Sequence, residues 1–185
     1  MRVLALADKR PPMDPALMAE QMGVQAVVCL GDLDRAWIET LTGLGIPKLG
    51  VHGNHDPPDL LRELEVEDLH GRRTSLRGLT FAGFEGCVRY GSGGPHQYTQ
   101  RKARKLAHKL PAADVLLSHC PPLGINDDPE DPAHVGFEGL RDWVEHHRPR
   151  HLLHGHVHPH GQRLMKQFGD TRVHWINGAR VVVLD

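Results

Sequence analysis

The sequence is poor in the features that mark membrane, nucleic-acid-binding and secreted proteins. Aromatic residues make up 5% of the chain and the formal net charge at pH 7 is −1, which disfavours an extended nucleic-acid contact without excluding one. No apolar run approaches the ~18 residues of a membrane span. A charge at Arg2 comes too early for a signal peptide. We therefore expect a cytoplasmic protein without a membrane partner.

Cysteine is also scarce. The three cysteines, Cys29, Cys87 and Cys120, form no Cys-x-x-Cys pair, and an odd number suits a reducing compartment. Of the 185 residues, 39% are apolar and 24% are charged, the balance of an ordinary globular protein. We predict a single domain over residues 1–185, large enough to fold without disulfides. The sequence leaves its oligomeric state open.

Histidine, in contrast, is abundant, with fifteen residues. A histidine-rich tract by itself indicates only that metal binding is feasible, so the spacing of the histidines must decide. Four histidines near the C-terminus are expected at the surface or at helix ends and not as metal ligands: His146, His147, His151 and His160.

Strand-like and helix-like segments alternate over the first sixty residues. Short apolar runs are separated by predicted helices over residues 14–22, 35–42 and 59–64. The first of these begins at a capping Asp14 and ends at Gly23, the usual order at helix ends. This βαβαβ order predicts parallel strands joined by right-handed crossovers.

The middle of the chain adds a hairpin, two helices and two loops. Residues 74–84 read as two strands around a tight turn, and helices are predicted over residues 99–110 and 137–147. Residues 83–94 are rich in glycine and residues 121–135 in proline and aspartate, so both are predicted loops. Loops of this length commonly carry function.

Turn signals divide the last segment. Gly169-Asp170 indicates one turn, and Asn177-Gly178 is a strong hairpin signal. We therefore predict two layers of strands, a mixed sheet from the α/β part and an antiparallel sheet from the later strands.

Side chains that can bind a metal follow short apolar runs at five places. Buried parallel strands read as such runs, and open α/β folds build their sites at the carboxyl ends of these strands. Carboxylate, amide oxygen and imidazole together suit divalent metals, so the sequence predicts a metal site at one sheet edge. The five places are Asp8, Asp32, the Gly53-Asn54-His55-Asp56 block, Ser118-His119, and the Gly155-His156-Val157-His158 block.

In this order and placement, these blocks resemble the calcineurin-like metallophosphoesterase superfamily, and the resemblance covers essentially the whole chain. It implies an α/β fold, a four-layer α-β-β-α sandwich of two mixed β-sheets flanked by helices, with the active site at one edge. Further segments resemble a little-described bacterial branch of this superfamily: Arg89-Tyr90, Tyr98-Thr99, Gly136-Phe137-Glu138 and His154-Gly155-His156.

The resemblance implies two divalent metal ions, with manganese expected and iron, zinc, cobalt or nickel as alternatives. The two ions would share Asp32 as a bridging ligand. The implied ligands are Asp8, Asp32 and His158 for the first ion, and Asp32, Asn54, His119 and His156 for the second.

The resemblance also implies in-line attack of a metal-bound hydroxide on phosphorus. The implied catalytic residues are His55 and Asp56. His55 would steady the developing charge or protonate the leaving oxygen, and either Asp34 or Asp56 would be the partner of its other ring nitrogen.

One position departs from the family's pattern. The family usually opens with Asp-x-His, whereas Arg10 stands third in Asp8-Lys9-Arg10. Arginine cannot be a metal ligand. Its charge would repel a divalent ion about 5 Å away by roughly 2 to 7 kcal/mol, for effective dielectrics of about 80 to 20. Three interpretations stay open: a weak or empty first metal site, an Arg10 that binds a substrate phosphate, or an Arg10 that points to solvent.

Two further residues are candidates for substrate binding. Arg89 lies in the glycine-rich loop, and His134 lies in the long loop that follows His119; for each, a solvated side chain is the alternative. The basic residues 101–105 invite a nucleic-acid interpretation, but we favour the exposed face of an amphipathic helix.

We expect a metallophosphoesterase, a hydrolase that acts on a small phosphorylated substrate. Phosphodiesters are favoured over monoesters because the short chain leaves no cap domain to enclose a monoester. A catalytically impaired scaffold or binding module is the first alternative, motivated by Arg10. A nuclease is the second, since nucleic acids are phosphodiesters.

Overall fold

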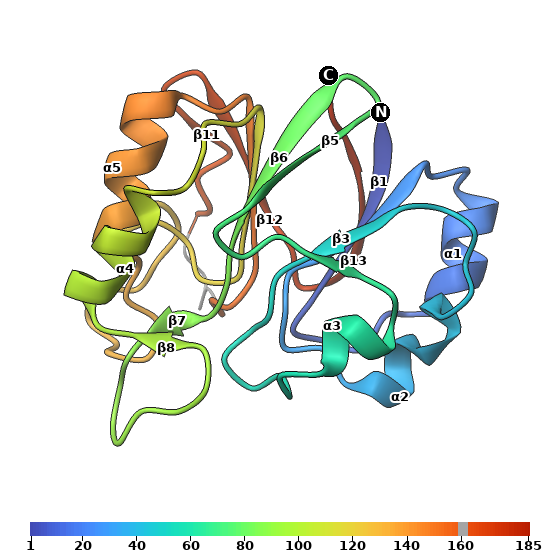
Figure 1. Ribbon diagram of the computed structural model, residues 1–185, viewed down its shortest axis with the longest axis horizontal. Helices are drawn as coiled ribbons and strands as arrows, with labels where there is room; N and C mark the ends of the chain where they lie inside the picture. Colours follow the sequence, from blue (N-terminus) through green and yellow to red (C-terminus); the bar gives the residue numbers. More distant parts are fainter. Residues whose placement is uncertain (159–162) are drawn as a thin grey trace.

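Two β-sheets lie face to face in the computed structural model, which describes residues 1–158 and 163–185 (Figure 1). The first sheet consists, in order, of β13 (Gly178–Val183), β1 (Arg2–Ala7), β2 (Ala26–Cys29), β3 (Lys48–Gly50) and β4 (Glu67–Asp68). The second consists of β11 (Gln167–Phe168), β12 (Thr171–Trp175), β10 (His151–His154), β9 (Val115–Ser118), β6 (Leu79–Phe84) and β5 (Arg73–Leu76). A small separate pair is formed by β7 (Cys87–Val88) and β8 (Gln97–Tyr98).

Helices cover the outer face of each sheet (Figure 1). Over the first sheet lie α1 (Pro15–Gln21), α2 (Arg35–Ile38), the 3-10 helix η1 (Glu39–Leu41) and α3 (Leu60–Glu63). Over the second lie α4 (Gln100–Ala107) and α5 (Glu138–His147). The layers therefore run α-β-β-α, and the predicted four-layer sandwich is confirmed.

Alternating side chains of the buried strands serve different layers. On β1, Val3, Ala5 and Ala7 belong to the core between the sheets, whereas Leu4 and Leu6 pack under the helices. All five are fully buried. A strand that is covered on both faces reads as a continuous apolar run, which is why the sequence revealed it.

The βαβαβ opening is confirmed, because β2 pairs in parallel with both β1 and β3. Asp14 caps α1, accepting a hydrogen bond from the Leu17 N–H at 2.9 Å. The helix predicted over residues 35–42 is shorter and divided, since Ile38 leaves helical dihedrals at φ −130°. The tighter turn that follows places both Ile38 and Leu41 in the core.

The prediction of an antiparallel second sheet was wrong. β9 pairs in parallel with both β6 and β10, and β10 with β12; only the edge strands β5 and β11 are antiparallel. Helices α4 and α5 lie between these strands in the sequence and make the crossovers that parallel pairing requires. The second sheet is therefore mixed, as the resemblance implied.

The two C-terminal turn signals have different outcomes. Gly169-Asp170 joins the antiparallel strands β11 and β12, as predicted. The hairpin predicted at Asn177-Gly178 was wrong, because β12 lies in the second sheet and β13 pairs with β1 in the first. The turn therefore carries the chain from one sheet to the other.

The predicted loop over residues 121–135 contains no helix or strand. The loop predicted over residues 83–94 was partly wrong, since it begins inside β6 and contains β7. No helix within the described ranges has the length and apolar character to cross a bilayer.

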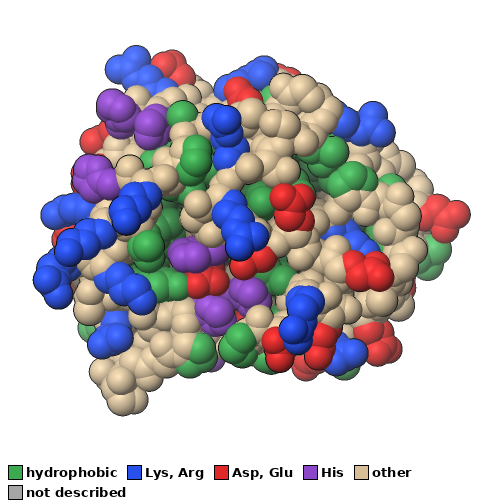
Figure 2. Space-filling view, viewed as in Figure 1, with side chains coloured by type: hydrophobic (Ala, Val, Ile, Leu, Met, Phe, Trp, Pro, Cys, Tyr) green, Lys and Arg blue, Asp and Glu red, His purple; other side chains and the backbone are tan. Residues whose placement is uncertain are grey.

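Of the histidines predicted at the surface, His146 is exposed at the end of α5, but His151 is fully buried. The His151 ring lies 3.1 Å from both His174 Nε2 and Asp185 Oδ1. His160 lies outside the described residues. The basic residues 101–105 are exposed except Ala103, as predicted, and lysine and arginine side chains gather at the left edge of Figure 2, where α4 and α5 lie in Figure 1.

Candidate metal centre

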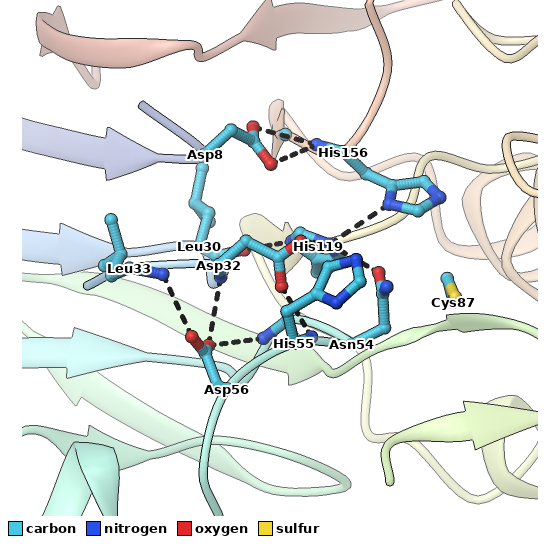
Figure 3. Close-up of polar contacts among 12 residues, drawn as sticks. Asp8, Leu30, Asp32, Leu33, Asn54, His55, Asp56, Cys87, His119 and His156 are labelled. Carbon is cyan, nitrogen blue, oxygen red and sulfur yellow. Dashed lines mark hydrogen bonds and ion pairs between the residues drawn. The ribbon is translucent and has the colours of Figure 1, made fainter. Parts of the chain in front are cut away.

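Five predicted ligands lie together at one edge of the sandwich, each just beyond the end of a strand (Figure 3). Asp8 follows β1, Asp32 follows β2, Asn54 follows β3, His119 follows β9 and His156 follows β10. The carboxyl ends of these parallel strands meet at this edge, which is where open α/β folds place their sites.

Three of these residues have left-handed backbone conformations: Asp8 (φ 60°), Asp32 (φ 52°) and His156 (φ 68°). Side chains other than glycine rarely adopt positive φ, and such residues cluster at functional sites. Here the sharp turn after each strand directs the side chain into the site instead of along the strand. Asp8 is further fixed because both of its carboxylate oxygens accept from the His156 N–H, at 3.0 and 3.1 Å.

Glycines beside the ligands allow the strand ends to approach one another. A Cβ on Gly53 would lie 2.0 Å from Asp32 Oδ1, and one on Gly155 would lie 2.6 Å from Asp8 Oδ2. Both distances are shorter than real side-chain contacts. The glycines of the two sequence blocks are therefore required by the packing of the ligands and not only by the turns.

The donor atoms of three ligands converge on His119. Its Nε2 lies 3.1 Å from Asn54 Oδ1, 3.1 Å from His156 Nδ1 and 3.5 Å from Asp32 Oδ2. Two ligands that are each about 2 Å from a tetrahedral ion lie about 3.3 Å apart. The observed separations therefore match the edges of a coordination sphere. Asn54, His119 and His156 are at most 6% exposed.

Backbone carbonyls fix the tautomers of both imidazoles. His119 donates from Nδ1 to the Leu30 carbonyl at 2.8 Å, and His156 donates from Nε2 to the Ala133 carbonyl at 2.8 Å. Each remaining ring nitrogen faces the other ligands. A second partner of this kind is the usual way in which a protein orients a metal-binding histidine.

The ionisable groups of the centre perturb one another strongly. Burial alone would lower the pKa of His119, but the hydrogen bond and charge of Asp32 raise it to about 9. Burial, aided by the charge of His119, lowers the pKa of His156 to about 3. Burial raises the pKa of Asp8 to about 6. A positive charge is therefore favoured between Asp32 and His119, which is where a bound cation would lie.

The Asp56 carboxylate forms its hydrogen bonds with backbone N–H groups of the ligand loops and does not orient the His55 ring. Its carboxylate accepts from the N–H groups of Asp32 at 3.0 Å, Leu33 at 2.9 Å and Gly53 at 2.7 Å. Asp34, the other predicted partner of His55, accepts from the Ala36 N–H and caps α2. These contacts give both carboxylates backbone partners.

A pocket of about 720 Å³ opens above the ligands. Its lining includes Asp8 from the five ligands, and also His55, His134 and His158, so three further predicted residues face the same space. The His134 ring lies 5.7 Å from that of His158 and is held by Asp131, whose Oδ2 is 2.6 Å from His134 Nδ1.

The structure does not bring Arg10 or Arg89 to the centre. Both are exposed, and neither is among the described residues that line the pocket. Arg10 follows the turn at Asp8, and its side chain corresponds to the solvent-facing interpretation.

Several pocket residues were not predicted from the sequence, among them Trp37, Leu60 and Tyr90. The Tyr90 hydroxyl accepts from Asn54 Nδ2 at 3.3 Å, so that Asn54 Oδ1 is left to face the ligands. Trp37 and Leu60 come from α2 and α3, and nothing in the sequence distinguishes them from ordinary core residues. Tyr90 adjoins Arg89, which was predicted instead.

The model of the calcineurin-like phosphoesterase family matches residues 14–160 of the chain. The chain therefore belongs to the calcineurin-like phosphoesterase family. The comparison with curated proteins gives no match.

Among solved structures, the chain is similar to the protein TT1561 of Thermus thermophilus, with a TM-score of 0.66, 19% identity, and coverage of 96% of this chain and 88% of that one. It is also similar to a hypothetical protein from Thermus thermophilus, with a TM-score of 0.54, 18% identity, and coverage of 96% and 76%. These likenesses support the fold alone.

Proposed function

We propose that the chain is a metal-dependent phosphoesterase that prefers phosphodiesters. The observation that carries the proposal is the convergence of Asp32, Asn54 and His156 on His119 Nε2, at separations of 3.1 to 3.5 Å. Family membership supports the same class of reaction. Once His119 loses its proton, it and His156 turn two nitrogen lone pairs toward each other at 3.1 Å, an arrangement that a cation relieves.

The residues fit one divalent ion held by Asp32, Asn54, His119 and His156. A second ion would be held by Asp8, Asp32 and His158, as the family's pattern implies. Manganese is the ion that we expect. When bound, such ions neutralise phosphoryl oxygens and acidify water. Arg10 replaces the family's usual histidine, so we expect the ion at Asp8, Asp32 and His158 to bind more weakly than the ion at His119.

His55 is the residue that we assign to proton transfer. It is exposed on the pocket wall, and its backbone N–H donates to Asp32 Oδ1 at 2.9 Å, which ties it to the ligands. From there its ring would contact a phosphoryl oxygen or protonate the leaving group. His134 would contact the substrate from the opposite loop, oriented by Asp131. Asp56 would position the ligand loops.

The preference for diesters rests on the residues that line the pocket together with the ligands. They include Trp37, Leu60 and Tyr90, which are apolar or aromatic side chains. This part of the lining gives room for the second ester group of a diester, which a monoester lacks. A small phosphodiester with an apolar or aromatic group is therefore the substrate class that we propose.

The test compares hydrolysis of bis(p-nitrophenyl) phosphate with that of p-nitrophenyl phosphate by the manganese-loaded chain. We expect kcat/KM to be higher for the diester, and to fall by about 100-fold or more in His55→Ala because proton transfer is lost. His146→Ala, an exposed histidine on α5, is the matched control. Faster cleavage of the monoester would overturn the preference, and full activity of His55→Ala would overturn the role of His55.

A further inference from the structure

A second group of buried ionisable side chains lies apart from the ligands described above. His52 follows β3, Glu85 lies between β6 and β7, and His96 precedes β8. We call these three residues the His52–Glu85–His96 cluster. His52 is 5% exposed and Glu85 is 7% exposed, and the His96 side chain is 12% exposed. None of the three is a proposed ligand or lines the pocket.

The cluster has the spacing of a metal-ligand set. Glu85 Oε2 lies 3.4 Å from His52 Nδ1 and 3.1 Å from His96 Nδ1. These separations bracket the edge of about 3.3 Å expected between ligands of a tetrahedral ion, and they match those around His119. One donor atom from each residue lies within 4.8 Å of the others.

The imidazoles of the cluster have unsatisfied nitrogens. His52 Nε2 and His96 Nε2 are buried without a hydrogen-bond partner, and His52 Nδ1 has only the longer 3.4 Å contact with Glu85 Oε2. Buried polar atoms are nearly always paired, so unpaired ones call for a role. The two rings are stacked, with centroids 4.6 Å apart and planes within 3°. Both present Nδ1 to the same carboxylate oxygen.

Neighbouring groups hold the Glu85 carboxylate in place, and the segments that carry His52, Glu85 and His96 pack closely against one another. The other oxygen of Glu85 accepts from the Tyr98 hydroxyl and lies 3.7 Å from His70 Nε2. The Gly86 N–H donates to the His52 carbonyl at 2.8 Å. A Cβ on Gly86 would lie 1.7 Å from the His96 carbonyl oxygen, so glycine is required there.

We propose that the His52–Glu85–His96 cluster binds one divalent transition-metal ion of the zinc class, through both Nδ1 atoms and Glu85 Oε2. Nitrogen and carboxylate donors suit this class. Tyr98 and His70 act on the carboxylate as orienting partners. The ion joins the end of β3 in the first sheet to the end of β6 in the second and to β8. Binding tilts one imidazole away from the stacked arrangement, because the ion must lie near both ring planes.

The test counts bound Co²⁺ in the full chain after the first centre is disabled by replacing its bridging carboxylate and one imidazole, in Asp32→Asn and His156→Ala. We expect about one equivalent to remain after desalting, with visible absorption of low-coordinate Co²⁺. Adding Glu85→Gln or His96→Ala should weaken this binding about 10- to 100-fold or more. Adding His146→Ala, the matched exposed histidine, should leave it unchanged.

Loss of all Co²⁺ from the Asp32→Asn/His156→Ala chain would overturn the proposal, as would binding that Glu85→Gln and His96→Ala leave unchanged. Circular dichroism checks the fold of each variant. If the cluster variants do not fold, nitrogen-15 NMR of histidines in the Asp32→Asn/His156→Ala chain decides. Zn²⁺ should shift the Nδ1 resonances of two histidines, and unshifted resonances would overturn the site. The outcome is independent of phosphoesterase activity.

Discussion

Asp56 illustrates how single residues hold the centre without binding a metal. Its carboxylate joins the loop after β2 to the loop after β3, by accepting from the N–H groups of Asp32, Leu33 and Gly53. Because Asp56 is only 3% exposed, water does not replace it easily when it is removed. Removing one partner of a buried hydrogen bond leaves the other group unsatisfied.

We therefore predict that Asp56→Ala lowers the free energy of unfolding of the metal-free chain by about 3 kcal/mol, since three buried N–H groups lose their acceptor. Urea denaturation measures this. Asp59→Ala is the matched control: its side chain is 63% exposed and pairs with Arg62 on the surface, so its expected cost is below about 1 kcal/mol. Equal costs for the two variants would contradict the account.

A second prediction concerns the close approach of Gly53 to Asp32. The Cβ of Gly53→Ala would lie 2.0 Å from Asp32 Oδ1, so the carboxylate has to move away from the other ligands. We expect manganese affinity to fall about tenfold or more, measured by titration calorimetry. Gly45→Ala adds a methyl group with nothing within 4 Å and should leave the affinity unchanged. Wild-type affinity of Gly53→Ala would show that the approach is not required.

At the scale of secondary structure, α4 and α5 cross where Gly139 meets Arg104. A Cβ on Gly139 would lie 2.6 Å from Arg104 Cα. Alanine favours a helix over glycine by about 1 kcal/mol, whereas overpacking costs about 1 to 3 kcal/mol. The contact is with backbone, which cannot rotate away, so the cost of overpacking should exceed the gain in helix propensity.

We predict that Gly139→Ala destabilises the chain by about 1 kcal/mol net, or more, in urea denaturation. Lys105→Ala, an exposed position on α4, should change stability by less than about 0.5 kcal/mol. A more stable Gly139→Ala chain would mean that the two helices separate readily.

The elements were predicted well where the sequence marks their ends. Capping residues such as Asp14 and Thr99 lie where α1 and α4 begin, because their side chains accept from backbone N–H groups. The pairing of strands was predicted less well. An apolar run indicates a buried strand but not its neighbour, so the parallel pairing at the centre of the second sheet and the crossing between sheets at Asn177-Gly178 were missed.

The candidate site also has some features that the sequence predicts and others that arise only in the folded chain. Ligands at strand ends could be predicted from order alone, because parallel strands bring their ends to one edge. Tyr90, Trp37 and the His52–Glu85–His96 cluster could not, since loops and helices bring them together only in the folded chain. The direction of Arg10 is likewise set by the turn at Asp8. That residues 1–185 form a single domain stays a prediction.

At the scale of the whole molecule, partly buried histidines that stay neutral in the folded chain make stability depend on pH. Burial, together with the neighbouring His151, lowers the pKa of His174 to about 4. The folded-state pKa is below the unfolded value of 6.5, so the folded chain favours neutral His174. This contribution is complete above pH 6.5 and is lost as the pH falls from 6.5 toward 4.

We predict that the stability advantage of the wild type over His174→Gln shrinks by about 1 kcal/mol or more between about pH 7.5 and about pH 4.5, measured by urea denaturation. The same comparison with His146→Gln, an exposed histidine, should not depend on pH. A difference that is constant over this range for His174→Gln would contradict the account.

The central claim is that the ligands around His119 hold an ion that the chain needs for phosphoester hydrolysis. The most direct test titrates metal-stripped chain with Mn²⁺ while hydrolysis of bis(p-nitrophenyl) phosphate is followed, beside Asp32→Asn as the ligand variant. We predict saturable activity in the wild type and a loss of about 100-fold or more in Asp32→Asn. No activity at any Mn²⁺ concentration, with the fold shown intact by circular dichroism, would contradict the claim and favour a catalytically impaired scaffold.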